Sequence, residues 1–190
     1  MARPRTFEEE RAVEAAMRTF WASGYEATST EELCRATGLG RSSIYNAFKS
    51  KHDLFEKALR RYMDEMTGDV VAILESDLPV RERVRAVLRR AVDTEAGDLP
   101  GCLVVNAMVE LAPRDARVAA MLERDYAVRR DALEAAIESG RRAGEIAADR
   151  DAAGLAHFVI ATVSGMRVAA RAGADRRALE GIAASAMNAL

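Results

Sequence analysis

Apolar residues recur along most of the chain at intervals of three and four positions, the spacing that places side chains on one face of an α-helix. The longest such stripe contains Phe55, Leu59, Tyr62, Met66, Val70 and Ile73. No run convincingly alternates apolar and polar residues, as a half-buried strand would. The pattern therefore predicts an all-α protein of about nine helices, at about 7–23, 31–36, 40–47, 51–74, 80–94, 103–111, 115–142, 151–172 and 175–190.

The second and third of these helices are joined by only a few residues. Ser29 is followed three residues later by Glu32, which predicts a capping box at the start of the second helix. Gly38 ends this helix, because glycine adopts a left-handed conformation without steric cost. The stretch from Thr28 to Phe48 therefore has the signals of a helix, a tight turn and a helix.

The helix at 40–47 is predicted to have two unlike sides. Its apolar side has Gly40, Ile44, Ala47 and Phe48. The opposite side has Ser42 and Asn46, with Ser43 and Tyr45 on the flanks and Arg41 at the edge. A short helix with one anchored face and one small, polar face fits the major groove of DNA. The alternative is a plain helical hairpin whose polar face is only solvated.

The flanking helices suggest how this hairpin is supported. The helix at 7–23 completes a three-helix bundle, since the hairpin alone cannot bury both its apolar faces. Before it, Ala2–Thr6 form a loose basic arm, which either reaches a minor groove or is a tail with incidental charge. The stripe at 51–74 is long enough to enter a second helical body. We therefore expect two domains, at residues 1–60 and 61–190.

Charge separates the hairpin region from the rest of the chain. Between Leu33 and Arg61 there are seven basic and two acidic residues, whereas the whole chain has a net charge of −2. All three lysines of the chain, at positions 49, 51 and 57, fall in this region. A locally basic surface on an acidic protein is expected where the protein contacts phosphate groups.

Three short runs in the N-terminal region have family-specific spacing. They are Gly24-Tyr25-Glu26-Ala27-Thr28-Ser29, Ala36-Thr37-Gly38-Leu39 and Ser43-Ile44-Tyr45-Asn46-Ala47-Phe48-Lys49-Ser50-Lys51. With them, residues 6–59 resemble the TetR/AcrR family of bacterial transcriptional repressors. The rest of the chain is similar to the family in length and helix layout only. The family often has serine, lysine and glycine where this chain has Gly40, Arg41 and Ser42, so the operator sequence does not carry over.

The resemblance implies a homodimeric repressor with a helix–turn–helix DNA-binding domain at 1–60 and an effector-binding and dimerisation domain at 61–190. Two recognition helices would then read a near-palindromic operator. Our candidates for base readout are Arg41, Ser42, Ser43 and Asn46. Our candidates for phosphate contact are Ser29, Tyr45, Lys49 and Lys51.

The resemblance also implies that a small molecule in the larger body releases the DNA. Flexible methionines and a few aromatic residues would form a wall suited to an apolar or amphipathic effector. The candidate wall residues are Met63, Met66, Cys102, Met108, Met121, Tyr126, Phe158 and Met166. Ordinary core packing explains the same residues.

The two C-terminal helices are rich in alanine and glycine, which lets another helix approach closely. This composition suits a symmetric four-helix interface between two chains. The candidate interface residues are Leu155, Val159, Thr162, Ile182 and Ala186. The alternative is packing within one chain.

The sequence lacks the common catalytic signatures, and with only two histidines we expect no histidine metal cluster. There is no glycine-rich phosphate loop, no His-Glu-x-x-His and no nucleophile elbow, so we expect neither an enzyme nor a cofactor. We expect His52 at the surface, with a phosphate contact as the alternative, and His157 either packed in the core or in contact with a ligand. We expect Cys34 in the core, whereas Cys102, at a helix start, is an alternative redox sensor.

The chain start also lacks the apolar core of a signal peptide. The most apolar run, Leu155–Met166, is too short to span a bilayer. These two features predict a cytoplasmic protein.

Overall fold

The computed structural model describes residues 3–95 and 101–190, and these residues form nine helices. They are α1 (Arg3–Ser23), α2 (Thr30–Thr37), α3 (Arg41–Phe48), α4 (Lys51–Leu74), α5 (Val80–Glu95), α6 (Leu103–Glu110), α7 (Ala116–Arg142), α8 (Ala152–Arg171) and α9 (Arg176–Met187). The predicted all-α class is confirmed. Apart from the start of α1 and the end of α9, each predicted end lies within one residue of the observed one.

The start of α1 differs from the prediction. The helix begins at Arg3, so Arg3–Thr6 are helical and do not form a loose arm, while Ala2 lies outside the described residues. Pro4 is compatible with this, because the first turn of a helix has no intrahelical acceptor for the N–H that proline lacks.

The three N-terminal helices form a small bundle around one core. The Ser29 hydroxyl accepts the Glu32 N–H at 3.1 Å, and the Glu32 carboxylate accepts the Ser29 N–H at 2.7 Å, so the capping box is present. Gly38 caps α2 with a φ of 71°. The bundle core contains Phe20, Leu33, Ile44, Phe48 and Phe55, all almost fully buried. Cys34 packs against this core, as predicted.

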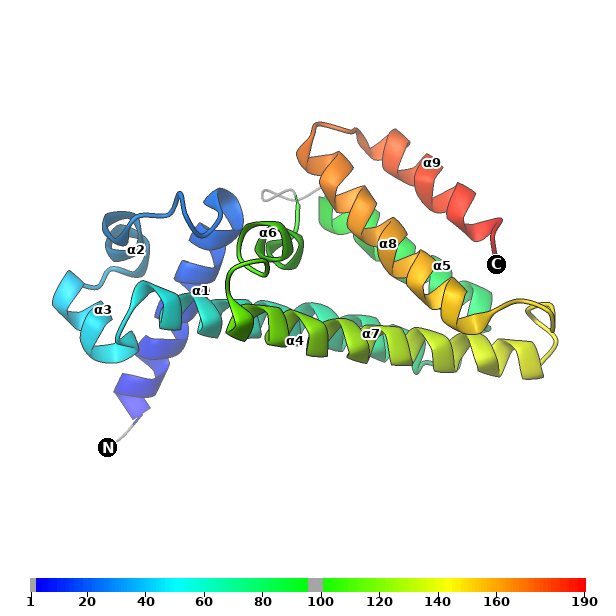
Figure 1. Ribbon diagram of the computed structural model, residues 1–190, viewed down its shortest axis with the longest axis horizontal. Coiled ribbons are helices and arrows are strands. Elements are labelled where there is room, and N and C mark those ends of the chain that lie inside the picture. The colour runs from blue at the N-terminus through cyan, green and yellow to red at the C-terminus, as the bar shows by residue number, and fades with distance from the viewer. Residues whose placement is uncertain (1–2, 96–100) are drawn as a thin grey trace.

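α4 leaves the bundle and runs beside α7 along the long axis of the molecule (Figure 1). The N-terminal core does not stop with the bundle. It continues into α6 and the first turns of α7, through Leu103, Val104, Ala107, Val118, Met121 and Leu122. The N-terminal bundle and the larger helical body are therefore in direct contact around α4.

A second core joins α5, α8, α9 and the distal half of α7 (Figure 1). Gly140 lies inside α7, which continues to Arg142. A Cβ on Gly140 would lie 2.3 Å from Cγ1 of Val80. The glycine therefore allows the first turn of α5 to approach α7 closely.

α8 is the most apolar long helix. By length and composition it could cross a membrane, with a mean hydropathy of 1.4 over 18 residues, of which 33% are buried in the protein. The sequence analysis considered only the run Leu155–Met166, which is shorter than the 20-residue helix. The buried third of the window packs in the second core, in contact with α5, α7 and α9.

Candidate DNA-binding interface and effector pocket

α3 presents a small, polar face to solvent. Ile44 and Phe48 are each 1% exposed and anchor the helix in the bundle core. All four side chains predicted for base readout are exposed, namely Arg41, Ser42, Ser43 and Asn46. Gly40 and Ala47 are exposed as well, although the pattern placed them on the apolar side. A two-turn helix brings only one i, i+4 pair fully into the core.

Tyr45 lies at the edge of this face, with 38% of its surface exposed. Hydrogen bonding with the Thr30 side chain lowers the pKa of Tyr45, and Arg41 acts in the same direction. The Arg41 guanidinium carbon lies 5.8 Å from the centre of the Tyr45 ring. The tyrosine ring thus contacts the Arg41 guanidinium at the first turn of α3.

Lys49 joins α3 to α4 in an unusual conformation. Its φ is 62° and its ψ is −45°, and it is the single non-glycine residue with positive φ among the described residues. The Ser50 N–H donates to the Phe48 carbonyl at 2.6 Å, which closes a three-residue γ-turn around Lys49. This form of γ-turn is rare and strained. It sets the exposed ammonium of Lys49 at the end of α3.

The other two candidates for phosphate contact lie nearby. The Ser29 hydroxyl accepts the cap hydrogen bond, which leaves its own proton to donate. The Lys51 ammonium lies 4.4 Å from the centre of the Tyr25 ring, a cation–π contact.

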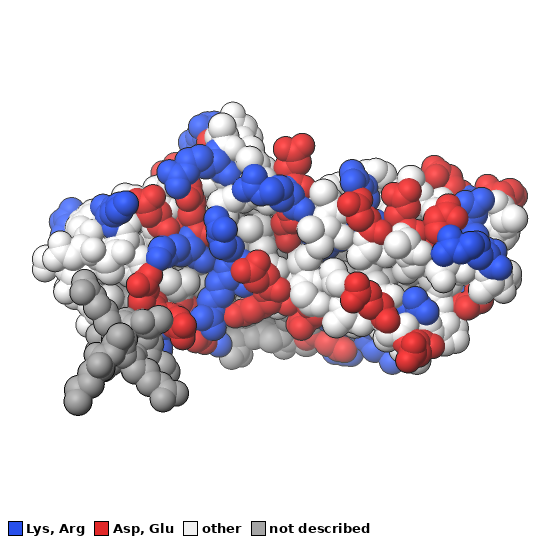
Figure 2. All heavy atoms as spheres, turned by 90° about the horizontal axis from the view of Figure 1, so that it is seen from below, with Lys and Arg blue, Asp and Glu red and all other residues white. Residues whose placement is uncertain are grey.

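The basic surface is smaller than the sequence count suggested. Several arginines and lysines of this region pair with acidic side chains: Arg35 with Glu31, Lys57 with Glu9, and Arg61 with Glu14 and Glu65. Arg41 and Lys49 form no ion pair within the described ranges. Figure 2 shows positive and negative side chains mixed over one face, with no continuous field of one sign. Arg41 and Lys49 lie at the first turn and at the C-cap of α3, so both ends of this helix keep an unneutralised positive charge.

The sequence predicted a surface position for His52, but its side chain is mostly buried and contacts two carboxylates. Its imidazole Nε2 bonds to the Asp115 carboxylate, and its Nδ1 lies 3.3 Å from Oε1 of Glu56. Its side chain is 29% exposed. The partner Asp115 is 63 residues away in sequence and caps α7, which sequence patterning could not reveal.

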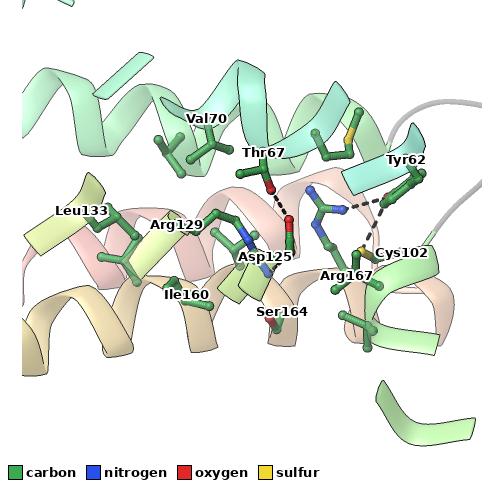
Figure 3. A pocket seen from close by; sticks show the side chains of 16 residues that line it. Tyr62, Thr67, Val70, Cys102, Asp125, Arg129, Leu133, Ile160, Ser164 and Arg167 are labelled. Carbon is green, nitrogen blue, oxygen red and sulfur yellow. Dashed lines mark hydrogen bonds and ion pairs between the residues drawn. The ribbon is translucent and has the colours of Figure 1, made fainter. Parts of the chain in front are cut away.

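A pocket of about 50 Å³ lies between α4, α6, α7 and α8, with Val87 of α5 also in its wall. Its walls are mainly apolar and include Met66, Val70, Val87, Val104, Val105, Leu133, Val159, Ile160 and Val163. Figure 3 shows two polar groups inside, one around Asp125 and one around Tyr62. Known ligand pockets have about 300–1,000 Å³, so this one accepts only a few atoms without enlargement.

The first polar group joins α4 to α7. Asp125 is 8% exposed and accepts a hydrogen bond from the Thr67 hydroxyl and another from the Arg129 guanidinium, both at 2.6 Å. The Nε of Arg129 is buried and has no hydrogen-bond partner within the described chain. This group brings an ion pair to an otherwise apolar wall.

The second polar group joins α4, α6 and α8. The Arg167 guanidinium donates to the Tyr62 hydroxyl at 3.1 Å, and that hydroxyl donates to Sγ of Cys102 at 3.5 Å. Burial is the main cause that raises the pKa of Tyr62. The tyrosine therefore stays neutral. It links Arg167, which is 105 residues away in sequence, to the thiol of Cys102, which is 40 residues away.

The pocket contains only part of the predicted wall. Met66 and Cys102 line it. Met166 is buried in the second core, and Met63 and Met121 border a separate groove between α4 and α7. Met108 packs against the N-terminal core, Phe158 is 41% exposed, and Tyr126 bonds to an exposed His157 at 2.5 Å. Helical spacing does not tell a wall residue from a core residue, and it missed Thr67, Asp125, Arg129 and Arg167.

Two family models match the chain. One is described as bacterial regulatory proteins of the tetR family and matches residues 12–58. The other is described as the Tetracyclin repressor-like C-terminal domain and matches residues 80–186, more than half of the chain. The chain belongs to the TetR family. It is a DNA-binding transcriptional repressor of this family and not an enzyme, as the sequence predicted.

Relatives cover almost the whole TetR-family chain. The transcriptional repressor ComR of Escherichia coli K12 is 31% identical over 188 residues, which cover 97% of this chain and 90% of ComR. The structure of a cysteine mutant of the regulator CifR with a 26-base-pair operator has a TM-score of 0.86 at 31% identity, with 98% of each chain covered. A TetR regulator of Chloroflexus aurantiacus has a TM-score of 0.86 at 26% identity, covering 96% of this chain and 93% of that one.

Small and apolar residues form an exposed stripe along α8 of this TetR-family protein. The stripe consists of Gly154, Phe158, Ala161, Gly165, Val168 and Ala172. Of the predicted interface residues, Val159 and Ala186 do not face outward, because they are 0% and 3% exposed within the chain. Leu155 and Thr162 are half-buried, and Ile182 on α9 is 37% exposed. The outward face of α8 is thus offset by one position from the predicted one.

Residues of α6 and α8, and Gly101 just before α6, form hydrogen bonds with the C-terminal end of α1 and the turn that follows it. The Glu110 carboxylate accepts the N–H groups of Tyr25 at 2.9 Å and Glu26 at 2.7 Å. The Arg171 guanidinium donates to the Ala22 carbonyl at 3.1 Å, and the Trp21 indole donates to the Gly101 carbonyl at 3.2 Å. These contacts connect the pocket helices to the DNA-binding unit. No sequence signal pointed to them, because the partners lie 80 or more residues apart.

Proposed function

We propose that the protein represses transcription as a homodimer that places two α3 helices in successive major grooves of a near-palindromic operator. The exposed polar face of α3, anchored by two fully buried side chains, is the observation that carries the proposal. Arg41 reads guanine and Asn46 reads adenine, each in the bidentate manner that these side chains allow. Ser42 and Ser43 contact neighbouring base edges.

Phosphate contacts fix the register of each α3. Lys49, Lys51, Ser29 and Tyr45 surround the recognition face at the ends of α2, α3 and α4. Contacts of this kind position a protein on the duplex without reading sequence. CifR, which this chain resembles over its full length, has been seen with double-stranded operator DNA, which supports this assignment.

The dimer interface in this proposal is the outward stripe of α8 together with Ile182 on α9. Phe158 and Val168 are exposed on the same face of α8. A continuous exposed apolar face on a protein commonly marks an interaction site. The glycines and alanines between them allow two α8 helices to pack closely across a two-fold axis. DNA binding places this dimer in the cytoplasm.

The effector in this proposal is a small amphipathic molecule that enters the pocket between α4, α6, α7 and α8. Its apolar part meets the valine and leucine walls, and a polar group meets the Asp125–Arg129 pair. Because the pocket has only about 50 Å³, most ligands must move helices to fit. A ligand can shift a conformational equilibrium only if it binds one of the two conformations more tightly. Here it would bind the conformation with the wider pocket more tightly, because the narrow pocket has no room for it.

A second candidate signal is oxidation of Cys102. Its thiol lines the pocket and accepts a hydrogen bond from Tyr62, which in turn bonds to Arg167. An oxygen added to this sulfur would occupy the small pocket much as an effector would. Operator binding that is unchanged after mild peroxide treatment would dismiss this candidate.

Operator selection from random duplex DNA tests the proposal. We expect a near-palindrome to be enriched, bound by one dimer, with an affinity that falls steeply as salt rises. Recovery of a single asymmetric half-site, or weak binding without any enriched motif, would overturn it. The selected duplex then serves as the probe for a search among small amphipathic molecules.

A further inference from the structure

The first turn of α4 gathers metal-ligating side chains outside the pocket and outside the recognition face. His52, Asp53 and Glu56 each offer one ligand atom, and these atoms lie within 4.8 Å of one another. We propose that these three side chains bind a divalent transition-metal ion of the zinc type, and that Asp115 orients the imidazole.

Glu56 is the first reason for this assignment. It is 9% exposed, and its Oε1 has no hydrogen-bond partner within the described chain. A buried carboxylate oxygen without a partner is costly, so a group that completes it is expected. The neighbouring atom is Nδ1 of His52, at 3.3 Å and outside hydrogen-bonding alignment.

That separation suits two ligands of one ion. With bonds of about 2.0–2.2 Å, two ligand atoms on a tetrahedral zinc ion lie about 3.3–3.6 Å apart. His52 and Glu56 are also four residues apart, so both side chains rise on the same face of α4. Asp53, one turn before Glu56, supplies the third ligand, and water completes the tetrahedron.

Asp115 fixes the imidazole from the other side. Its Oδ2 bonds to Nε2 of His52, and its Oδ1 accepts the N–H groups of Arg117 and Val118 at 3.0 and 3.1 Å. A proton on Nε2 leaves the lone pair of Nδ1 facing Glu56. This carboxylate–histidine–metal order is the usual arrangement around a histidine ligand.

The charges of the cluster favour a cation. Asp53, Glu56 and Asp115 carry three negative charges, and the one cationic side chain paired with them in the described chain is Arg117. Its guanidinium lies 2.6 Å from Oε2 of Glu56 and 3.9 Å from Oδ1 of Asp53. The Arg117 side chain is 68% exposed and can swing into solvent. It is therefore a competitor of the metal ion and not a fixed part of the site.

The site lies where a bound ion would matter for the whole protein. α4 begins three residues after the recognition helix ends, and Asp115 is the N-cap of α7 in the body. An ion at His52 therefore ties the DNA-binding unit to the body through one imidazole. Binding that requires the folded site also stabilises the fold.

A titration of the full chain, freed of metal with a chelator, tests the proposal. We expect zinc chloride to bind one ion per chain by calorimetry and to raise the melting temperature. Cobalt(II) should give the visible bands of a tetrahedral site without a thiolate charge-transfer band, which separates this site from Cys34 and Cys102. Absence of zinc binding in the wild-type protein would overturn the proposal.

Variants locate the ion. E56Q and D53N should each abolish binding, and D115N should weaken it by about 10–100-fold. H157Q removes the other histidine and should bind zinc like wild type. R117A should bind zinc more tightly, because it removes the competing cation, whereas a merely structural cluster would give no such gain. Binding that survives in both E56Q and D53N, or that is lost in H157Q, would contradict the assignment; D53N is the informative variant if E56Q fails to fold.

Discussion

At the scale of single residues, Lys49 carries two opposing requirements. The proposed function assigns its ammonium to a phosphate contact. Its backbone, however, is held in a γ-turn that disfavours any side chain. Positions of this kind, where strain persists beside a functional surface, are common at binding sites. Stability and DNA affinity should therefore change in opposite directions at this residue.

We expect K49G to raise the free energy of unfolding by about 1 kcal/mol, since glycine adopts positive φ without strain. The same change should weaken binding to all DNA sequences alike and flatten the salt dependence, because one phosphate contact is lost. K49A is the matched control, which loses the charge and keeps the strain. Chemical denaturation and salt-titrated binding measure both effects, and equal stability of K49G and K49A would refute the strain argument.

Asn46 has the opposite role in the proposed function, where it contacts a base edge and no phosphate. N46A should relax preference at one position in each half-site, by about 1–3 kcal/mol of discrimination. Its affinity for unrelated DNA should stay as in wild type. Operator selection repeated with the variant checks this, and an unaltered profile would remove Asn46 from base readout.

At the scale of elements, caps and close approaches hold the helices in place. α2 begins with a reciprocal pair of hydrogen bonds between Ser29 and Glu32, and α7 meets α5 at a glycine. The sequence pattern predicted the cap, because both partners lie within four residues. It gave no reason for Gly140 inside α7, because its close neighbour Val80 lies on another helix.

The cap should make α2 sensitive to acid. Hydrogen bonds from the backbone and side chain of Ser29 lower the pKa of Glu32 below its ordinary value of 4.5. A lowered folded-state pKa gives stability that is present above pH 4.5 and is lost as the pH falls through the folded value. We expect E32Q to melt below wild type at neutral pH and to converge with it in acid. A difference that stays constant across this range would contradict the assignment.

Two glycines in helices should respond oppositely to alanine. G140A places a Cβ 2.3 Å from Val80 and should destabilise the protein by about 1–3 kcal/mol. G68A on the exposed side of α4 meets nothing within 4 Å and should stabilise it by about 0.5–1 kcal/mol. Thermal and chemical unfolding of the two variants compare them directly, and similar changes in both would show that the α5–α7 contact is loose.

At the scale of the whole molecule, the arrangement couples a pocket to a DNA-reading end. α4 forms part of both, since Phe55 packs in the bundle and Met66 lines the pocket. Glu110 and Arg171 add a second link, from α6 and α8 to the end of α1. In the proposed function, a ligand that widens the pocket would therefore displace the N-terminal bundle through two separate connections.

The outward stripe of α8 should control assembly. V168D places a charge on this stripe and should convert the dimer to a monomer, with a large loss of operator affinity, because one recognition helix no longer positions the other. V128D is the control on an equally exposed valine of α7, and should remain dimeric. Light scattering and operator binding test both, and a V168D protein that stays dimeric would place the interface elsewhere.

The sequence by itself determined most helix bounds, the caps of α2 and the two residues, Ile44 and Phe48, that anchor α3, because helical periodicity and capping depend on residues within about four positions of one another. The family followed from the same local runs. The tertiary structure alone decided which residues line the pocket, which basic side chains are neutralised and what His52 contacts. These features join residues such as Tyr62 and Arg167, which are 105 positions apart, and no local pattern records which distant side chain a folded chain brings to a given place.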